Sequence, residues 1–344
     1  MAARSRRHLL NLLAFLVGVV FLAGVVWGLG PEQLAERIAG AGPGWLLLVG
    51  TGLAVLAGDS LALKVAVGHP AFTWPRAAAT ALSGAAVNAL TPIGEAGEAI
   101  KVNLVSGWVP GEQAVSAVLV WNLLYRLTNW GLVFVSPFLV LAAGSVAFTP
   151  VALAGLTAAA LLVFTPTLLL LLAVRKGAAT LATRILSTLP VLRRRDWGKL
   201  AEAAARTDRL VSQAWSLRRR DTALAAALLL SARLAGCLEV WLAMRLVGWS
   251  VSFPDAVFLS AGNTLVRVLV SASPVQVGVV EAGAGGLYHL LGLPAEVGVA
   301  QGILRRARML LFNLAGLLYL ALSAAGRGRG KPETAKVARR LQST

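Results

Sequence analysis

The sequence is poor in cysteine, histidine and charge. Cys237 is the single cysteine among 344 residues, so a disulfide within the chain is excluded. His8, His69 and His289 are too widely separated to form a recognisable metal-ligand set, and we expect no metal or other cofactor. Charged residues make up 14% of the chain and hydrophobic residues 57%. A water-soluble domain of this length carries more charge, so the bilayer is the expected solvent.

Acidic residues are also scarce relative to basic ones. The chain has 15 acidic and 32 basic residues, with a net charge of +17. Such a balance can indicate a nucleic-acid binder, but the basic residues fall between apolar blocks rather than along one soluble face. We therefore expect them to orient the protein in a membrane, and we expect no nucleic-acid partner.

Long apolar blocks dominate what is present. An α-helix rises about 1.5 Å per residue, so crossing a hydrocarbon core takes roughly 20 apolar residues. Six blocks qualify, at residues 8–29, 44–67, 112–140, 150–174, 221–248 and 295–324. The first block follows Arg4, Arg6 and Arg7 as in a signal peptide, but it is longer than a usual signal region. No clear cleavage site follows it, so we expect a retained span.

Two further apolar regions, 76–106 and 255–291, are interrupted near their middles. Thr91-Pro92-Ile93-Gly94 breaks the first, and Ser273-Pro274-Val275-Gln276-Val277-Gly278 breaks the second. Each piece would span only about 18–24 Å as a helix, too short to cross comfortably. The sequence therefore predicts an all-α integral membrane protein with about six transmembrane helices and two re-entrant helical hairpins.

The basic residues predict the orientation. Cytoplasmic loops carry an excess of Lys and Arg, and the richest segments are the N-terminus, residues 175–220 and the tail 325–344. We expect one membrane domain, 1–344, in a bacterial-type inner (plasma) membrane with both termini cytoplasmic. The 175–220 loop is either partly an amphipathic helix beside anionic headgroups or a solvated loop.

The two broken regions share an order of landmark residues. Pro75, Pro92, Glu98, Pro110, Glu112 and Arg126 are echoed by Pro254, Pro274, Glu281, Pro294, Glu296 and Arg308. Each half, about 8–140 and 150–324, would contain three spans and one hairpin. Because three is odd, the second half would run inverted relative to the first. Chance similarity in a chain rich in Ala, Leu and Val is the alternative.

Charged residues follow the first break at helical spacing. Glu95, Glu98 and Lys101 lie at i, i+3 and i+6, so an ion pair between Glu98 and Lys101 is feasible. An ionisable residue inside a membrane costs roughly 3 kcal/mol on insertion scales, which makes function the default hypothesis. Alternatively, Glu98 and Glu281 only cap the N-termini of half-helices.

The third and sixth spans each carry a polar stripe. The first stripe contains Asn122, Tyr125, Arg126 and Asn129, and the second contains Gln301, Arg305, Arg306 and Arg308. A guanidinium suits bidentate contact with phosphate, so an anionic lipid headgroup is the expected ligand. Alternatively, Arg308 pairs with Glu281 to hold two helices together, and Arg305 or Arg306 extends to an interface.

The candidate substrate-binding residues are Glu95, Glu98, Lys101, Asn122, Tyr125, Arg126, Asn129, Gln276, Glu281, Arg305 and Arg308. Other polar residues in or beside spans give individually weak signals: Asp59, Lys64, Asn88, Arg233, Glu239, Arg245, Asn263 and Arg267.

The segment Pro92-Ile93-Gly94-Glu95-Ala96-Gly97-Glu98-Ala99-Ile100-Lys101, followed downstream by Pro274-x-x-x-Gly278-x-x-Glu281, resembles a known family. It is similar to the flippase-like membrane family named after the transmembrane region of lysylphosphatidylglycerol synthase, over nearly the whole chain. The resemblance implies an all-helical lipid-handling module, which in the namesake proteins accompanies translocation of an aminoacylated phospholipid. Relatives are associated with hopanoid and polyprenyl-linked pathways.

Three function classes follow. The leading hypothesis is a flippase for an anionic or aminoacylated phospholipid, or another lipid-linked substrate, with membrane lipids as partners. The second is a non-transporting partner that presents a polyprenyl- or hopanoid-type lipid to a separate lipid-modifying enzyme. A membrane-embedded enzyme is third, because no nucleophile or metalloprotease motif is recognisable. About 20 residues follow the last span, so we expect no aminoacyl-transfer domain and no synthase activity. The oligomeric state stays open.

Overall fold

The structure is a computed structural model that describes residues 39–90, 96–145, 154–158, 219–271 and 286–326, with isolated positions at 32, 36, 161, 162, 164, 165, 202, 205 and 209. Its regular elements are helices: η1 (Gly42–Gly44), α3 (Trp45–Val67), α4 (Trp74–Leu90), α5 (Ala96–Val105), α6 (Gly111–Ala142), α10 (Arg219–Leu246), α11 (Phe253–Ser271) and α13 (Ala295–Gly326). The predicted span 8–29, most of 150–174 and most of the 175–220 loop lie outside the described residues. The all-helical class that the sequence predicts is confirmed.

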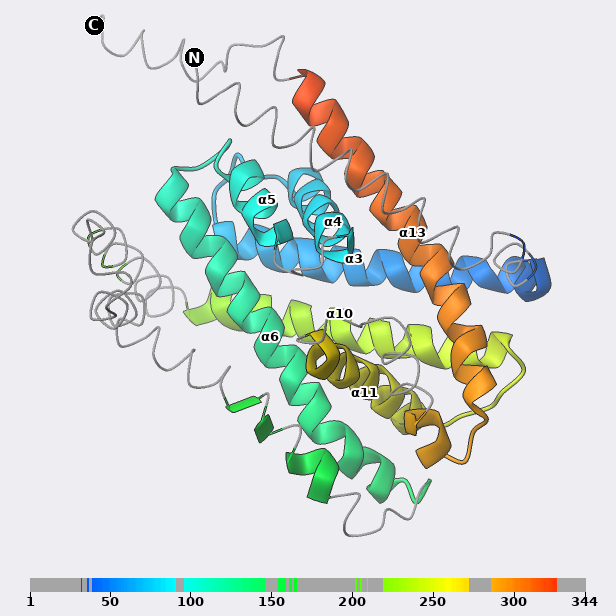
Figure 1. Ribbon diagram of the computed structural model, residues 1–344. Helices are drawn as coiled ribbons and strands as arrows, with labels where there is room; N and C mark the ends of the chain where they lie inside the picture. The colour runs from blue at the N-terminus through cyan, green and yellow to red at the C-terminus, as the bar shows by residue number, and fades with distance from the viewer. Residues whose placement is uncertain are drawn as a thin grey trace, which may run out of the picture.

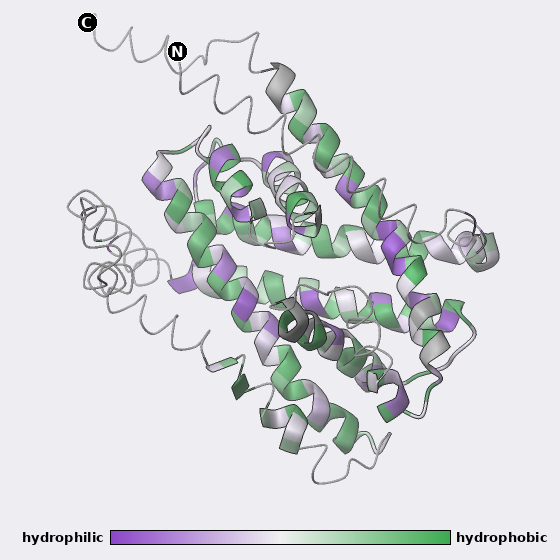
Figure 2. Cartoon of the chain, viewed as in Figure 1, coloured by the Kyte–Doolittle hydropathy of each residue, from purple (hydrophilic) through white to green (hydrophobic). Residues whose placement is uncertain are grey.

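Four helices are long and apolar enough to cross a bilayer. They are Ala39–Val67, Gly111–Ala142, Arg219–Leu246 and Ala300–Ser323. Each coincides with one of the six predicted spans, within the error of a helix boundary. Figure 2 shows hydrophobic residues over most of their length, with polar positions interspersed.

The ends of the helices follow local sequence signals. Gly68 ends α3 at a φ of 59°, in the left-handed region that glycine adopts without steric cost. Pro75 and Pro254 each take the second position of a helix, where a missing N–H costs nothing. At the start of α11, Ser252 and Asp255 form a capping box, in which Asp255 Oδ2 accepts from Ser252 N–H at 2.9 Å.

The helices α3 and α10 form the most extensive pair and run antiparallel. Gly44 before α3 lies against Leu246 at the end of α10, while Gly58 lies against Ala232. A Cβ built on Gly58 would be 2.8 Å from the Cβ of Ala232 and 2.8 Å from the carbonyl oxygen of Leu228. The close crossing therefore requires glycine at position 58, as is typical of tightly packed membrane helices.

Further contacts fix the direction of the other long helices. Gln113 Nε2 donates to the carbonyl of Val67 at 3.3 Å, so α6 begins beside the end of α3 and runs back along it. Along α13, Leu304 packs near Leu48 of α3 and Arg308 lies against Gly52, four residues further along each helix. Accordingly α3 and α13 run one way, and α6 and α10 run the other (Figure 1).

Shorter helices fill the space between the long ones. The antiparallel pair α4 and α5 connects α3 to α6, and α4 packs against α13, where Ser83 Oγ donates to the carbonyl of Gly316 at 3.1 Å. The helix α11 packs against α6 through Trp130 and Leu265. The first predicted half ends with α6 and the second with α13. Each of these two long helices therefore packs against a short helix of the other half (Figure 1).

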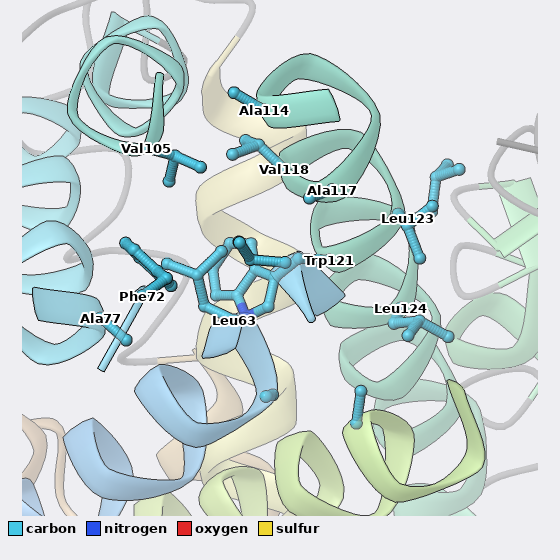
Figure 3. Close-up of a cluster of buried hydrophobic side chains, with 14 of the residues drawn as sticks. Leu63, Phe72, Ala77, Val105, Ala114, Ala117, Val118, Trp121, Leu123 and Leu124 are labelled. Carbon is cyan, nitrogen blue, oxygen red and sulfur yellow. The ribbon is translucent and has the colours of Figure 1, made fainter. Parts of the chain in front are cut away.

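The largest buried cluster surrounds Trp121 of α6. Its indole packs among Leu63 of α3, Phe72 of the α3–α4 connection and Val105 of α5 (Figure 3). Trp121 is 4% exposed, and its Nε1 donates to the carbonyl of Asp59 at 3.0 Å. An indole in an apolar core needs a partner for its N–H, and this bond supplies one. The cluster fixes α6 against α3 and the α4–α5 pair.

Candidate functional site

A polar cavity of about 160 Å³ lies among the helices α3, α6, α10, α11 and α13. Its wall contains the charged residues Arg233, Glu239, Arg305 and Arg308 and the neutral polar residues Asn129, Ser260 and Thr264. Such a concentration of ionisable groups between membrane helices marks a candidate substrate site, because charge in a membrane is retained where function needs it.

Glu239 binds the two arginines of α13 that line the cavity. Its side chain is 1% exposed, and its Oε1 accepts from Arg308 Nη2 at 2.9 Å, from Arg308 Nε at 3.1 Å and from Arg305 Nε at 3.3 Å. One carboxylate of α10 therefore binds two guanidinium groups of α13. The sharing leaves positive charge that one carboxylate cannot balance.

The approach of Arg308 to α3 depends on a glycine. A Cβ built on Gly52 would lie 2.6 Å from Arg308 Cδ and 3.0 Å from its Nη1. A larger residue at position 52 would push the guanidinium away from Glu239. The phenyl ring of Phe312 lies beyond the guanidinium, with its centroid 5.3 Å from Arg308 Cζ.

Arg233 forms the second ion pair. Its Nη2 lies 2.5 Å from Asp59 Oδ1 on α3, and its Cζ is 4.4 Å from the ring centroid of Tyr125 on α6. The guanidinium therefore joins three helices through one ion pair and one cation–π contact. Its buried Nε has no hydrogen-bond partner, although Arg233 lines the cavity.

The predicted stripe on α6 divides between two roles. Asn129 lines the cavity, and Tyr125 lies under Arg233. Arg126 Nε donates to Asn122 Oδ1 at 2.9 Å, one turn away on the same helix. Of the two arginine-bearing stripes, the one on α13 therefore supplies guanidinium groups to the cavity wall, namely those of Arg305 and Arg308.

Glu98 and Lys101 form a separate cluster between α4 and α5. The predicted ion pair is present, with Lys101 Nζ 2.8 Å from Glu98 Oε1. Asn88 Nδ2 donates to the same oxygen at 3.2 Å, and Asn88 Oδ1 accepts from Gly97 N–H at 2.6 Å. These bonds tie the first turn of α5 to the last turn of α4, in agreement with a role in ordering a half-helix.

Among the described residues, Trp121 links this cluster to the cavity network. Lys101 is 4% exposed, and its Nζ lies 3.9 Å from the centroid of the Trp121 ring. The same ring donates through Nε1 to the carbonyl of Asp59, whose carboxylate pairs with Arg233. Trp121 therefore lies between Lys101 of α5 and the backbone of Asp59, the residue whose carboxylate pairs with Arg233.

Three candidate residues, Glu95, Gln276 and Glu281, lie outside the described residues. The alternative that pairs Arg308 with Glu281 is therefore untested, whereas the pairing with Glu239 is observed. Sequence reasoning gave Glu239, Arg233 and Asp59 only weak weight. The signal that could have found them is the presence of ionisable residues well inside two long apolar blocks, Asp59 within 44–67 and both Arg233 and Glu239 within 221–248.

Fold and site together define an all-helical membrane protein with a basic polar cavity among its spans. The sequence model described as the lysylphosphatidylglycerol synthase TM region matches residues 11–316, and the chain belongs to that family. No curated protein and no solved structure matches the chain. The family connects the chain to membrane lipids, in agreement with the resemblance found in the sequence.

Proposed function

We propose that the protein is a lipid translocase that moves an anionic or aminoacylated phospholipid, or another lipid-linked substrate, across the inner membrane. The observation that carries the proposal is the cavity walled by Arg233, Arg305, Arg308 and Glu239. Family membership supports a lipid as the substrate. The proposed activity is transport, with no covalent chemistry by the chain itself.

Guanidinium groups in this position suit a lipid phosphate. Arg305 and Arg308 share one carboxylate, so a phosphate can accept hydrogen bonds from the guanidinium nitrogens that do not bind Glu239. Planar guanidinium groups bind phosphate oxygens in bidentate fashion, and the low-dielectric surroundings strengthen each such bond. The headgroup would enter the cavity while the acyl chains stay in lipid.

The directions of the long helices support the predicted topology. The helices α3 and α6 are antiparallel, so the α4 and α5 pair between them leaves and returns on one side, as a re-entrant hairpin does. The same holds for the connection between α10 and α13. Because α6 and α10 run the same way, the predicted topology places one crossing between residues 142 and 219. The predicted span at 150–174, which lies mostly outside the described residues, would be that crossing.

The proline landmarks support an inverted repeat. Pro75 and Pro254 occupy matching positions in α4 and α11, and Pro110 and Pro294 directly precede α6 and α13. A short helix of each half also packs against the last long helix of the other half: α4 packs against α13, and α11 packs against α6. Two inverted halves around a central site suit alternating access, in which one half rocks against the other.

The experiment uses purified protein in liposomes with a panel of fluorescent anionic, aminoacylated and polyprenyl-linked lipids. We expect at least one lipid to cross faster than in protein-free liposomes, and Arg308→Ala to reduce its rate by about tenfold or more. Arg245→Ala is the matched control, because Arg245 is an exposed arginine of α10 that lies over Trp241 and does not line the cavity.

Two outcomes would contradict the proposal. If no lipid of the panel crosses, the protein does not translocate these lipids, and the non-transporting partner becomes the better hypothesis. If lipid crosses equally fast in the wild type, Arg308→Ala and Arg245→Ala proteins, movement does not pass through the cavity.

A further inference from the structure

We propose that the cavity selects a headgroup with one net negative charge, namely a phosphodiester with a neutral, hydroxyl-bearing substituent, and discriminates against cationic aminoacylated headgroups. The inference rests on the proposed function and names its substrate class. It follows from which donors and acceptors of the cavity are already engaged.

The unengaged donors are guanidinium nitrogens. Arg305 contacts Glu239 through Nε alone, so its two terminal nitrogens have no partner among the described residues. Its side chain is 25% exposed, whereas that of Arg308 is 14% exposed and uses both Nε and Nη2 on Glu239. Arg233 adds a buried Nε without a partner. These donors, on α10 and α13, line one cavity and suit the oxygens of one phosphate.

The carboxylates already have guanidinium partners. Glu239 is the one carboxylate in the described wall of the cavity, and its Oε1 accepts from two arginines. Asp59 behind the wall pairs with Arg233. An aminoacyl ammonium that approached Glu239 would therefore share one carboxylate with two guanidinium groups. That arrangement adds a third positive charge to a carboxylate that cannot balance the two it already binds, which is unfavourable away from water.

The charge balance sets the preferred charge of the ligand. Among the described residues, three guanidinium groups face two carboxylates in this network, so a ligand with one negative charge neutralises it. A zwitterionic headgroup adds no net charge, and a cationic one adds to the excess. The uncharged part of the wall, with Asn129, Ser260 and Thr264, offers amide and hydroxyl groups to hydroxyls of a substituent such as glycerol.

Binding of short-chain lipids in detergent tests the inference without requiring transport. The probes are dihexanoyl phosphatidylglycerol, its lysyl ester and dihexanoyl phosphatidylethanolamine, measured by calorimetry. We expect phosphatidylglycerol to bind about tenfold more tightly than either of the others. Soluble glycerophosphoglycerol forms a further arm, since tight binding of it would identify a free phosphodiester rather than a lipid as the ligand.

Charge variants test whether the cavity sets this preference for phosphatidylglycerol. Arg305→Ala makes the network neutral and should bring the affinities for phosphatidylglycerol and phosphatidylethanolamine to within about threefold of each other. Arg306→Ala, the neighbour on α13 outside the described cavity wall, should keep the wild-type ratio. The ratio is read within each protein, so a fall in overall stability does not mimic the effect.

The inference is overturned if the lysyl ester binds as tightly as phosphatidylglycerol, or if Arg305→Ala keeps the wild-type ratio. Neither result contradicts the proposed translocase. The first would make an aminoacylated lipid the better candidate substrate, and the second would show that the charge of Arg305 does not set the headgroup preference. Selective binding without movement in liposomes would instead contradict the translocase and keep the headgroup preference.

Discussion

Asp59 and Arg233, which form an ion pair, each directly follow a residue of a close helix contact, in which Gly58 of α3 lies against Ala232 of α10. The tight crossing brings the backbones of the two helices together, and the ion pair lies beside it. Packing and charge therefore meet at one point of the membrane bundle, beside the cavity. Substitutions at Gly58 and at the ion pair separate the contribution of packing to stability from the contribution of charge.

Replacing Gly58 with leucine should prevent the close crossing. The new side chain would meet the carbonyl oxygen of Leu228 and the Cβ of Ala232, each 2.8 Å from a Cβ at position 58. Overpacking of this kind costs about 1–3 kcal/mol, so the melting temperature of the purified protein in detergent should fall. Gly50→Leu is the control, because a Cβ on Gly50 meets nothing within 4 Å. Equal melting temperatures would contradict the crossing.

Removing only one member of the ion pair should be worse than removing both. Asp59→Ala leaves the guanidinium of Arg233, whose side chain is 12% exposed, without its carboxylate. We expect a loss of roughly 3–5 kcal/mol, and recovery of part of it in the double variant Asp59→Ala/Arg233→Met. Thermal unfolding of the three proteins measures this. A double variant less stable than Asp59→Ala would show that the pair is not coupled.

Trp121 should contribute mainly through its ring. Trp121→Phe keeps an aromatic ring beside Lys101 and loses the N–H that donates to Asp59, a loss of about 1 kcal/mol. Trp121→Ala also leaves a void in the cluster of Figure 3 and should cost about 3–5 kcal/mol. Unfolding midpoints of the two variants give the comparison, and equal losses would contradict the packing role.

Single cysteines should report the proposed sides of the membrane. In a Cys237→Ala background, cysteines at Gly107 and Arg219 should react with an impermeant maleimide only from the cytoplasm. Cysteines at Ser145 and Trp249 should react only from outside, since Ser145 follows the end of α6 and Trp249 follows the end of α10, whereas Gly107 precedes α6 and Arg219 begins α10. Labelling of residues 107 and 145 from the same side would refute the topology.

Much of the fold could be predicted from the sequence because length and hydropathy fix where a helix can cross a membrane. The spans at 44–67, 112–140, 221–248 and 295–324 agree with α3, α6, α10 and α13. The Glu98 and Lys101 pair was also predicted, since residues three apart on a helix are neighbours whatever surrounds them.

The cavity could not be predicted in the same way because its contacts cross between helices far apart in the chain. Arg308 and Glu239 are 69 residues apart, and Arg233 and Asp59 are 174 apart. Spacing along one helix states which side chains share a face, but it does not state which helix that face meets. Glu239 therefore looked like one weak polar signal, although it binds two arginines.

Photolabelling with a phosphatidylglycerol analogue that carries a diazirine in its headgroup tests the central claim most directly. After irradiation in liposomes, mass spectrometry locates the modified peptides. If the headgroup enters the cavity, the label should fall on the α10 and α13 segments around Glu239 and Arg305, and unlabelled phosphatidylglycerol should compete with it. Label confined to exposed apolar positions of α13, such as Leu314 and Leu318, would show that the lipid only surrounds the protein.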